Sequence, residues 1–255
     1  GHRWFKLKVG GDVAADVERL ASIASVLDRL PHPYRVSLDG NEQYDDVDGV
    51  VALWRAMCAD ARLRRLVDAV AFVEQPIRRA AALSRDMGAL AHERPVIVDE
   101  SDDSLDAFPR ERALGYAGVS SKTCKGLYKS MLNAARCARW NRDAGADRFF
   151  MSAEDLTIQA GLALQQDLAL VSLLGITHVE RNGHHYVDGM AALPAAEQQA
   201  FLDAHPDLYE RSHGAVRVRL RDGRLGIGSL DAPGYASGAM PDWGAMRTMS
   251  DGWSA

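Results

Sequence analysis

Carboxylates follow three successive apolar runs of the chain, each at the point where its run ends. Asp39, Glu74 and Asp99 stand at these points, and each comes roughly 30 residues, the length of one βα unit, after the last. Carboxylate oxygens are the ligands that a hard cation such as Mg²⁺ prefers. One acidic residue at such a place often only begins a loop or caps a helix, but three in register indicate a shared cation site.

Lysine is scarce in this chain, and its positions are informative. Most of the 30 basic residues are arginines, and the lysines are Lys6, Lys8, Lys122, Lys125 and Lys129. All but Lys129, which we assign to the protein surface, stand at or just past the ends of two apolar runs. Burial and neighbouring charge can bring the pKa of a lysine toward the working pH, whereas arginine stays charged. We therefore expect lysines to carry out proton transfer here.

The elements that place these side chains follow from an alternation of short apolar runs with longer stretches of helical period. The predicted strands are Trp4 to Val9, Tyr34 to Leu38, Ala69 to Val73, Val96 to Val98, Gly118 to Ser121, Phe149 to Met151 and Ile176 to Val179. The predicted helices are Asp12 to Leu30, Asp46 to Leu66, Arg78 to His92, Leu105 to Leu114, Leu127 to Asp143 and Ile158 to Leu174. This order is typical of a parallel (β/α) barrel, in which the active site gathers at the carboxyl ends of the strands.

The alternation of strands and helices ends at about Pro194. Asp222-Gly223 lies between Val216 to Leu220 and Arg224 to Ile227, which predicts a hairpin. We therefore divide the chain into a barrel domain, residues 1–190, and a C-terminal segment, residues 191–255, that packs on a capping domain or on a partner subunit.

Composition excludes several classes of partner. A formal net charge of -5 without any Lys/Arg-rich run argues against nucleic acid or an anionic membrane. The longest apolar stretch is too short to cross a bilayer, and the first residues do not form a secretory signal. The cysteines, Cys58, Cys124 and Cys137, form no C-x-x-C pair. We therefore expect a cytoplasmic protein.

Five segments, in this order and spacing, carry a resemblance to a known family. They are Lys6-Leu7-Lys8-Val9-Gly10, Asp39-Gly40-Asn41, Val73-Glu74-Gln75-Pro76, Val98-Asp99-Glu100-Ser101 and Lys122-Thr123-Cys124-Lys125-Gly126. Together they resemble the enolase superfamily, in particular its mandelate-racemase and muconate-lactonizing branches. The resemblance implies a TIM-like (β/α)7β barrel, and the family's N-terminal capping domain and first barrel strand have no counterpart in these residues.

The resemblance also implies the roles of the site residues. Asp39, Glu74 and Asp99 would bind Mg²⁺, Lys8 would be the base on one face of the substrate, and Lys122 its counterpart on the other. This superfamily is a known case of Lys or His bases working beside Mg²⁺. Residues that would contact the substrate or support the site are Lys6, Asn41, Glu100, Lys125, Glu154 and His178.

The resemblance leaves the reaction open. The mandelate-racemase branch has a His where this chain has Met151-Ser152-Ala153-Glu154, so two lysines favour the muconate-lactonizing branch. By this resemblance we expect a homo-oligomeric, Mg²⁺-dependent racemase, epimerase or cycloisomerase that acts on a small carboxylate substrate and removes the proton next to the carboxylate through an enediolate. The alternatives are a lyase that eliminates water from a hydroxy acid through the same intermediate, and a barrel scaffold without catalysis. His184 and His185 remain without a role.

Overall fold

The computed structural model describes residues 1–155, 159–181 and 186–246. The chain forms two compact units. The barrel unit comprises residues 1–154 and 176–180, and the second unit comprises residues 155–175 and 181–255. His184 and His185 lie outside the described residues. The division predicted at residue 190 stays a prediction.

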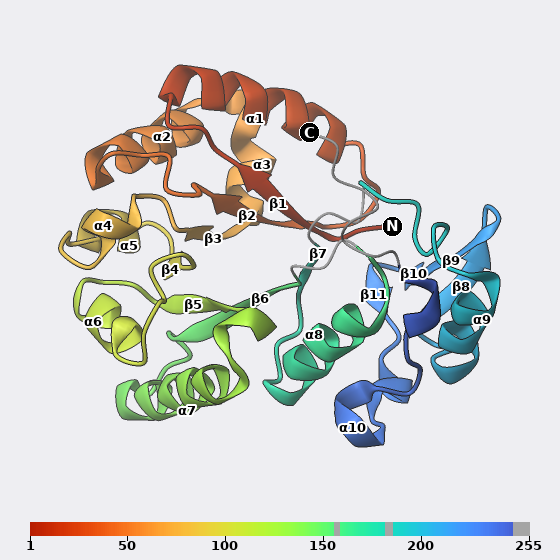
Figure 1. Ribbon diagram of the computed structural model, residues 1–255. Helices are drawn as coiled ribbons and strands as arrows, with labels where there is room; N and C mark the ends of the chain where they lie inside the picture. Colours follow the sequence, from red (N-terminus) through yellow and green to blue (C-terminus); the bar gives the residue numbers. More distant parts are fainter. Residues whose placement is uncertain (156–158, 182–185, 247–255) are drawn as a thin grey trace, which may run out of the picture. The chain divides into compact units, whose positions relative to one another are not determined.

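A parallel sheet forms the centre of the barrel unit. Its strands are β1 (Trp4–Lys8), β2 (Arg35–Asp39), β3 (Val70–Glu74), β4 (Val96–Val98), β5 (Gly118–Ser121), β6 (Phe150–Asp155) and β7 (Glu180–Arg181). They stand side by side in sequence order (Figure 1). The sheet curves until its first and last strands come near each other. Lys6 Nζ on β1 lies 2.5 Å from Glu180 Oε2 on β7. The predicted barrel fold is therefore confirmed, as a nearly closed parallel barrel.

Helices cover the outer side of the strands (Figure 1). In the barrel unit they are α1 (Val13–Leu27), α2 (Val47–Ala59), η1 (Ala61–Leu63), α3 (Arg64–Ala69), α4 (Arg79–Ala82), α5 (Gly88–Ala91), α6 (Ala107–Ala113), η2 (Thr123–Lys125) and α7 (Leu127–Ala144). The amphipathic pattern explains their placement, since α1 buries Leu20, Ala24 and Leu27 while its other face stays exposed. Asp12 begins this helix as its N-cap by accepting a hydrogen bond from Ala15 N.

Inside the barrel, a layer of rings lies one step below the carboxyl ends of the strands. The ring centroid of His178 is 4.3 Å from that of Trp4 and 5.9 Å from that of Phe72. Phe72 lies two residues before Glu74, as Trp4 lies two residues before Lys6. Because side chains alternate across a strand, these rings share the inward face with the charged residues above them.

Three predicted elements are wrong in detail. The predicted helix from Asp46 to Leu66 breaks at Asp60, which is extended (φ -88°, ψ 112°) and caps the next turn by accepting a hydrogen bond from Arg62 N. The predicted helix from Arg78 to His92 is two short helices, because Met87 N donates to Leu114 O instead of continuing the helix. The last strand is Glu180–Arg181 rather than Ile176 to Val179.

The second unit holds the remaining helices and two small hairpins. Its helices are α8 (Leu162–Leu173), α9 (Ala195–Ala204), η3 (Gly228–Leu230), α10 (Pro233–Ala236) and η4 (Trp243–Ala245), and its strands are β8 (Tyr209–Ser212), β9 (Ala215–Val218), β10 (Leu220–Arg221) and β11 (Arg224–Leu225). The hairpin predicted at Asp222-Gly223 is confirmed as β10 paired with β11. It is shorter than predicted, because β9 pairs with β8 instead, around His213 and Gly214. Both of those turn residues have positive φ, as a tight hairpin turn requires.

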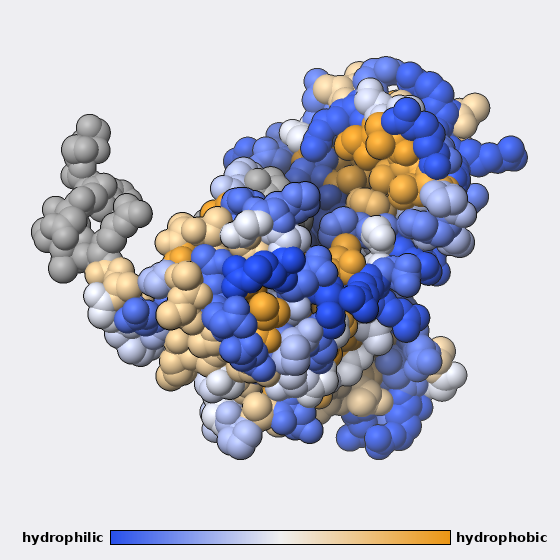
Figure 2. Space-filling model, turned by 90° about the vertical axis from the view of Figure 1, so that its right-hand side faces the viewer, coloured by the Kyte–Doolittle hydropathy of each residue, from blue (hydrophilic) through white to orange (hydrophobic). Residues whose placement is uncertain are grey.

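Within the described residues, no helix is both long enough and apolar enough to cross a membrane. In the view of Figure 2 most of the surface is hydrophilic, and hydrophobic residues gather in patches.

Candidate functional site

The carboxyl ends of the strands bring four acidic side chains into the barrel. Asp39 ends β2, Glu74 ends β3, Asp99 follows β4 directly, and Glu154 lies near the end of β6. Parallel pairing places Asp39 beside Glu74 in the sheet. All four residues are at most 5% exposed. Burying several carboxylates together is costly unless cations neutralise them.

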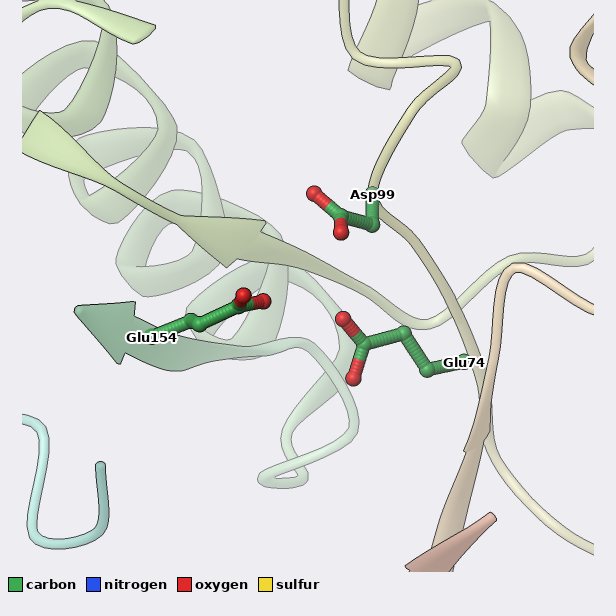
Figure 3. A group of neighbouring side chains, drawn as sticks. All are labelled: Glu74, Asp99 and Glu154. Atoms are coloured by element: carbon green, nitrogen blue, oxygen red, sulfur yellow. The ribbon is translucent and has the colours of Figure 1, made fainter. Parts of the chain in front are cut away.

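Glu74, Asp99 and Glu154 form the acidic group most suited to a metal ion. One carboxylate oxygen of each lies within 4.8 Å of the others, and within the described ranges this is the one group of three possible ligands at such spacing. Figure 3 shows the three side chains pointing toward one another from β3, the segment after β4, and β6. The sequence had placed Asp39 in this role and Glu154 in a supporting one.

Asp39 is instead occupied by lysines from the neighbouring strand. Its Oδ2 accepts a hydrogen bond from Lys8 and lies 2.9 Å from Lys6 Nζ. Its Oδ1 accepts a hydrogen bond from Asn41 N at 2.8 Å. Asp39 therefore lies beside the acidic group, and its role as a metal ligand stays a prediction.

Lys6 is the central cation of the site. Its Nζ lies 2.9 Å from Asp39, 3.1 Å from Glu74, 3.4 Å from Glu154 and 2.5 Å from Glu180. Burial lowers the pKa of Lys6, but the surrounding carboxylates outweigh this effect and the net pKa is raised. The charged form of Lys6 is therefore favoured, and its ammonium offsets part of the negative charge of the surrounding acids.

Lys122 reaches the same group from the other side of the barrel. Its Nζ lies 2.6 Å from Asp99 Oδ2 and 3.0 Å from Glu154 Oε2. Burial lowers the pKa of Lys122, whereas Asp99 and Glu154 raise it, and the net shift is upward. The sequence predicted an environment that lowers the pKa of the catalytic lysines. The pKa of Lys122 is raised instead, because two carboxylates contact its ammonium directly.

Lys8 and Lys122 come from opposite sides of the ring of strands. Lys8 ends β1, and Lys122 follows β5, three or four strands away in either direction around the barrel. The Lys8 side chain is 45% exposed, while that of Lys122 is 12% exposed. The two amines can therefore approach a small molecule held between them from two directions.

The donor set fits a divalent cation. Glu74 Oε1 is buried, and it lies 3.1 Å from the ammonium of Lys6, a cation that Glu74 shares with three other carboxylates. Burial raises the pKa of Glu74, and Asp39 and Asp99 raise it further while Lys6 lowers it. The negative charge at Glu74 is thus incompletely neutralised by the chain itself. A hard cation that takes oxygen ligands supplies the missing positive charge.

The remaining predicted site residues lie at different depths. Asn41 Nδ2 donates to Glu100 Oε1 at 2.7 Å, which links the ends of β2 and β4. Lys125 contacts Asp99, with Nζ 2.9 Å from its Oδ1. His178 lies in the ring layer beside Trp4, at the amino end of β1, and its Nε2 is 3.1 Å from Ser152 Oγ. The structure thus separates His178 from the acidic group.

Two residues differ from what the sequence suggested. Glu180 contacts Lys6 but was not among the candidates, although its position at the end of the last apolar run was the available signal. Lys129 was assigned to the surface, which is wrong. Its side chain is 10% exposed, and its Nζ lies 3.1 Å from Asp102 Oδ2.

The protein is a (β/α) barrel, nearly closed, with acids and lysines at the carboxyl ends of its parallel strands. Barrels of this class hold their active sites at that end. The family model described as enolase C-terminal domain-like matches residues 1–237. The chain therefore belongs to this family, the C-terminal barrel domain of the mandelate-racemase and muconate-lactonizing enzymes of the enolase superfamily, and the resemblance seen in the sequence is confirmed.

Solved structures agree on the fold. A mandelate racemase/muconate lactonizing protein from Herpetosiphon aurantiacus is 20% identical with a TM-score of 0.57, and the match covers 88% of this chain and 55% of that one. An enolase superfamily member of unknown function from Enterococcus faecalis V583 is 18% identical with a TM-score of 0.55, covering 90% and 52%.

A racemase from Streptomyces coelicolor A3(2) with bound magnesium is 19% identical with a TM-score of 0.48, covering 71% and 47%. This chain thus spans about half the length of the structures it matches. No curated protein matches it.

Proposed function

We propose that this chain is the barrel part of a Mg²⁺-dependent enzyme that removes the proton next to a substrate carboxylate through an enediolate. The reaction would be a racemisation, an epimerisation or a cycloisomerisation. The observation that supports it is a set of buried carboxylates contacted from opposite sides of one barrel. Lys8 contacts Asp39, and Lys122 contacts Asp99 and Glu154. A scaffold has no need for buried carboxylates that cost free energy.

In this proposal the two lysines divide the proton transfer. One amine takes the proton from one face of the substrate carbon, and the other delivers a proton to the opposite face or accepts one there. Lys6 stays charged and lies where a substrate carboxylate would need a cation. Glu154, in contact with both Lys6 and Lys122, holds the two ammonium groups in place.

Glu74 and Asp99 would hold the cation together with a third carboxylate. Asp39 is the third ligand that the sequence predicts, and Glu154 is the one that the distances between ligand atoms favour. When bound, a divalent cation supplies positive charge that stabilises the negative charge developing on the substrate carboxylate. Trp4, Phe72 and His178 form an aromatic layer beneath the site.

The test is exchange of the substrate proton with solvent deuterium. Full-length protein with Mg²⁺ is incubated in D₂O with a set of small carboxylates, beside its Lys8→Ala and Lys122→Ala variants. We expect wild type to incorporate deuterium next to a carboxylate and each variant to lose incorporation for one configuration. Net loss of water from the exchanging compound would identify a lyase instead. Unchanged exchange in both variants would rule out the two-lysine assignment.

A further inference from the structure

The ammonium of Lys125 is fully engaged inside the protein. Lys125 ends the short turn η2 that follows β5, and its side chain is 13% exposed. Its Nζ donates to Asp99 O at 2.7 Å and to Ser120 O at 2.9 Å, and it lies 2.9 Å from Asp99 Oδ1. A lysine ammonium has three N–H donors, so these three oxygens use all of them. Lys125 therefore has no donor left for a substrate.

These contacts give the two oxygens of Asp99 different partners. Oδ1 faces Lys125, and Oδ2 lies 2.6 Å from Lys122. The backbone of Asp99 is held as well, since its N–H donates to Gln75 Oε1 at 3.0 Å and its carbonyl accepts from Lys125. The carboxylate thus cannot rotate without losing a contact on each side.

Lys122 shows which of the two oxygens faces the acidic group. Its Nζ touches Asp99 Oδ2 and also Glu154 Oε2. Oδ2 therefore lies on the side of Glu154, and Oδ1 lies on the side of Lys125.

Lys125 is itself held from behind by a second buried acid. Asp102 Oδ2 lies 3.8 Å from Lys125 Nζ and 3.1 Å from Lys129 Nζ. Asp102 is 4% exposed, so water screens these charges little. Gly126, with φ of 100°, lets the chain turn from η2 into α7 while Lys125 points back into the barrel.

We propose that Lys125 is a positioning residue that fixes the orientation of Asp99, so that Oδ2 alone is presented to the metal ion. This rests on the proposed function, in which Asp99 is a metal ligand. Lys125 contacts Asp99 Oδ1 and two backbone carbonyls at the ends of β4 and β5. Lys125 therefore stays on Oδ1 when the cation binds. Lys122 is the lysine that gives up its contact with Asp99.

The experiment measures Mg²⁺ affinity by isothermal titration calorimetry on the full-length protein. Lys125→Met removes the ammonium while keeping the length of the side chain. We expect it to weaken Mg²⁺ binding by about 10–100-fold, as loss of a residue that orients a ligand typically does. Lys125→Arg should recover part of this affinity. Lys129→Met is the matched control, because Lys129 is equally buried and contacts Asp102 but not Asp99, and it should bind Mg²⁺ like wild type.

Equal affinity in Lys125→Met and wild type would overturn the positioning role and leave the proposed function standing. Absence of Mg²⁺ binding by wild type would overturn both. A crystal structure of the Mg²⁺-loaded wild type gives an answer even where Lys125→Met fails to fold. Asp99 Oδ2 on the metal with Lys125 still on Oδ1 supports the proposal, whereas Oδ1 on the metal refutes it.

Discussion

The Nζ of Lys6, on the first strand of the sheet, lies 2.5 Å from Oε2 of Glu180, on the last. This ion pair links the two edge strands of the nearly closed barrel at the level of the charged residues. Lys6 also neutralises Asp39, Glu74 and Glu154. One amine therefore holds together acids from four strands.

Replacing Lys6 by Met should destabilise the protein severely. The change leaves buried carboxylates without their common cation, and breaking a buried ion pair in this way costs about 3–5 kcal/mol. Urea unfolding measures the difference. The control is Lys8→Met, because Lys8 is half exposed and its one ion pair within the described residues is with Asp39, so its loss should cost about 1 kcal/mol or less. Equal stability of the two variants would show that the ammonium of Lys6 does not stabilise the buried carboxylates.

Single substitutions identify the third metal ligand. Glu74→Gln and Asp99→Asn should both weaken Mg²⁺ binding by more than the roughly 10–100-fold loss that follows removal of an outer-shell partner. Calorimetric titration of Asp39→Asn and Glu154→Gln then separates the two arrangements. A large loss in Asp39→Asn alone supports the ligands predicted from the sequence. A large loss in Glu154→Gln alone supports the group with the shortest distances between ligand atoms.

His178 should make stability depend on pH. Burial lowers its pKa from the ordinary value of 6.5 to about 4. Between these values the unfolded chain binds a proton that the folded chain does not, so stability falls as the pH decreases from 6.5 toward 4, by as much as about 3 kcal/mol.

His178→Phe keeps a ring beside Trp4 and removes the titration. The free energy of unfolding of this variant should therefore decrease less between pH 7 and pH 4.5 than that of wild type. Parallel pH profiles for the two proteins would mean that His178 is protonated as readily when folded as when unfolded.

Gly40 should not tolerate a side chain. A Cβ at this position would lie 2.5 Å from Pro76 Cα and 2.9 Å from Pro76 O, both in the backbone of the neighbouring loop. Gly40→Ala must push the loops after β2 and β3 apart, at a cost of about 1–3 kcal/mol. Thermal unfolding measures this. Gly10→Ala is the control, because the nearest atom to its added Cβ, Asp16 Oδ1, is 3.5 Å away, and its melting temperature should stay close to that of wild type.

The local sequence predicted which residues lie at the carboxyl ends of the strands. Asp39, Glu74, Asp99 and Lys122 stand where apolar runs end, and such runs become strands whose carboxyl ends share one edge of a parallel sheet. The hairpin at Asp222-Gly223 followed from turn chemistry in the same way. The helix breaks at Asp60 and Met87 could not be predicted in this way. The helical pattern of the sequence continues through both residues, and each break depends on a hydrogen bond or a buried side chain that competes with the helix.

The amino-acid sequence by itself determined the family, the barrel and the strand ends that carry acids and lysines, because these depend on the order and spacing of residues along the chain. Only the tertiary structure decided which side chains meet. Glu154 rather than Asp39 joins Glu74 and Asp99, and Lys129 is buried against Asp102. The reason is that contacts across a barrel depend on how far the sheet curves and where long side chains reach, and periodicity along one strand does not encode either.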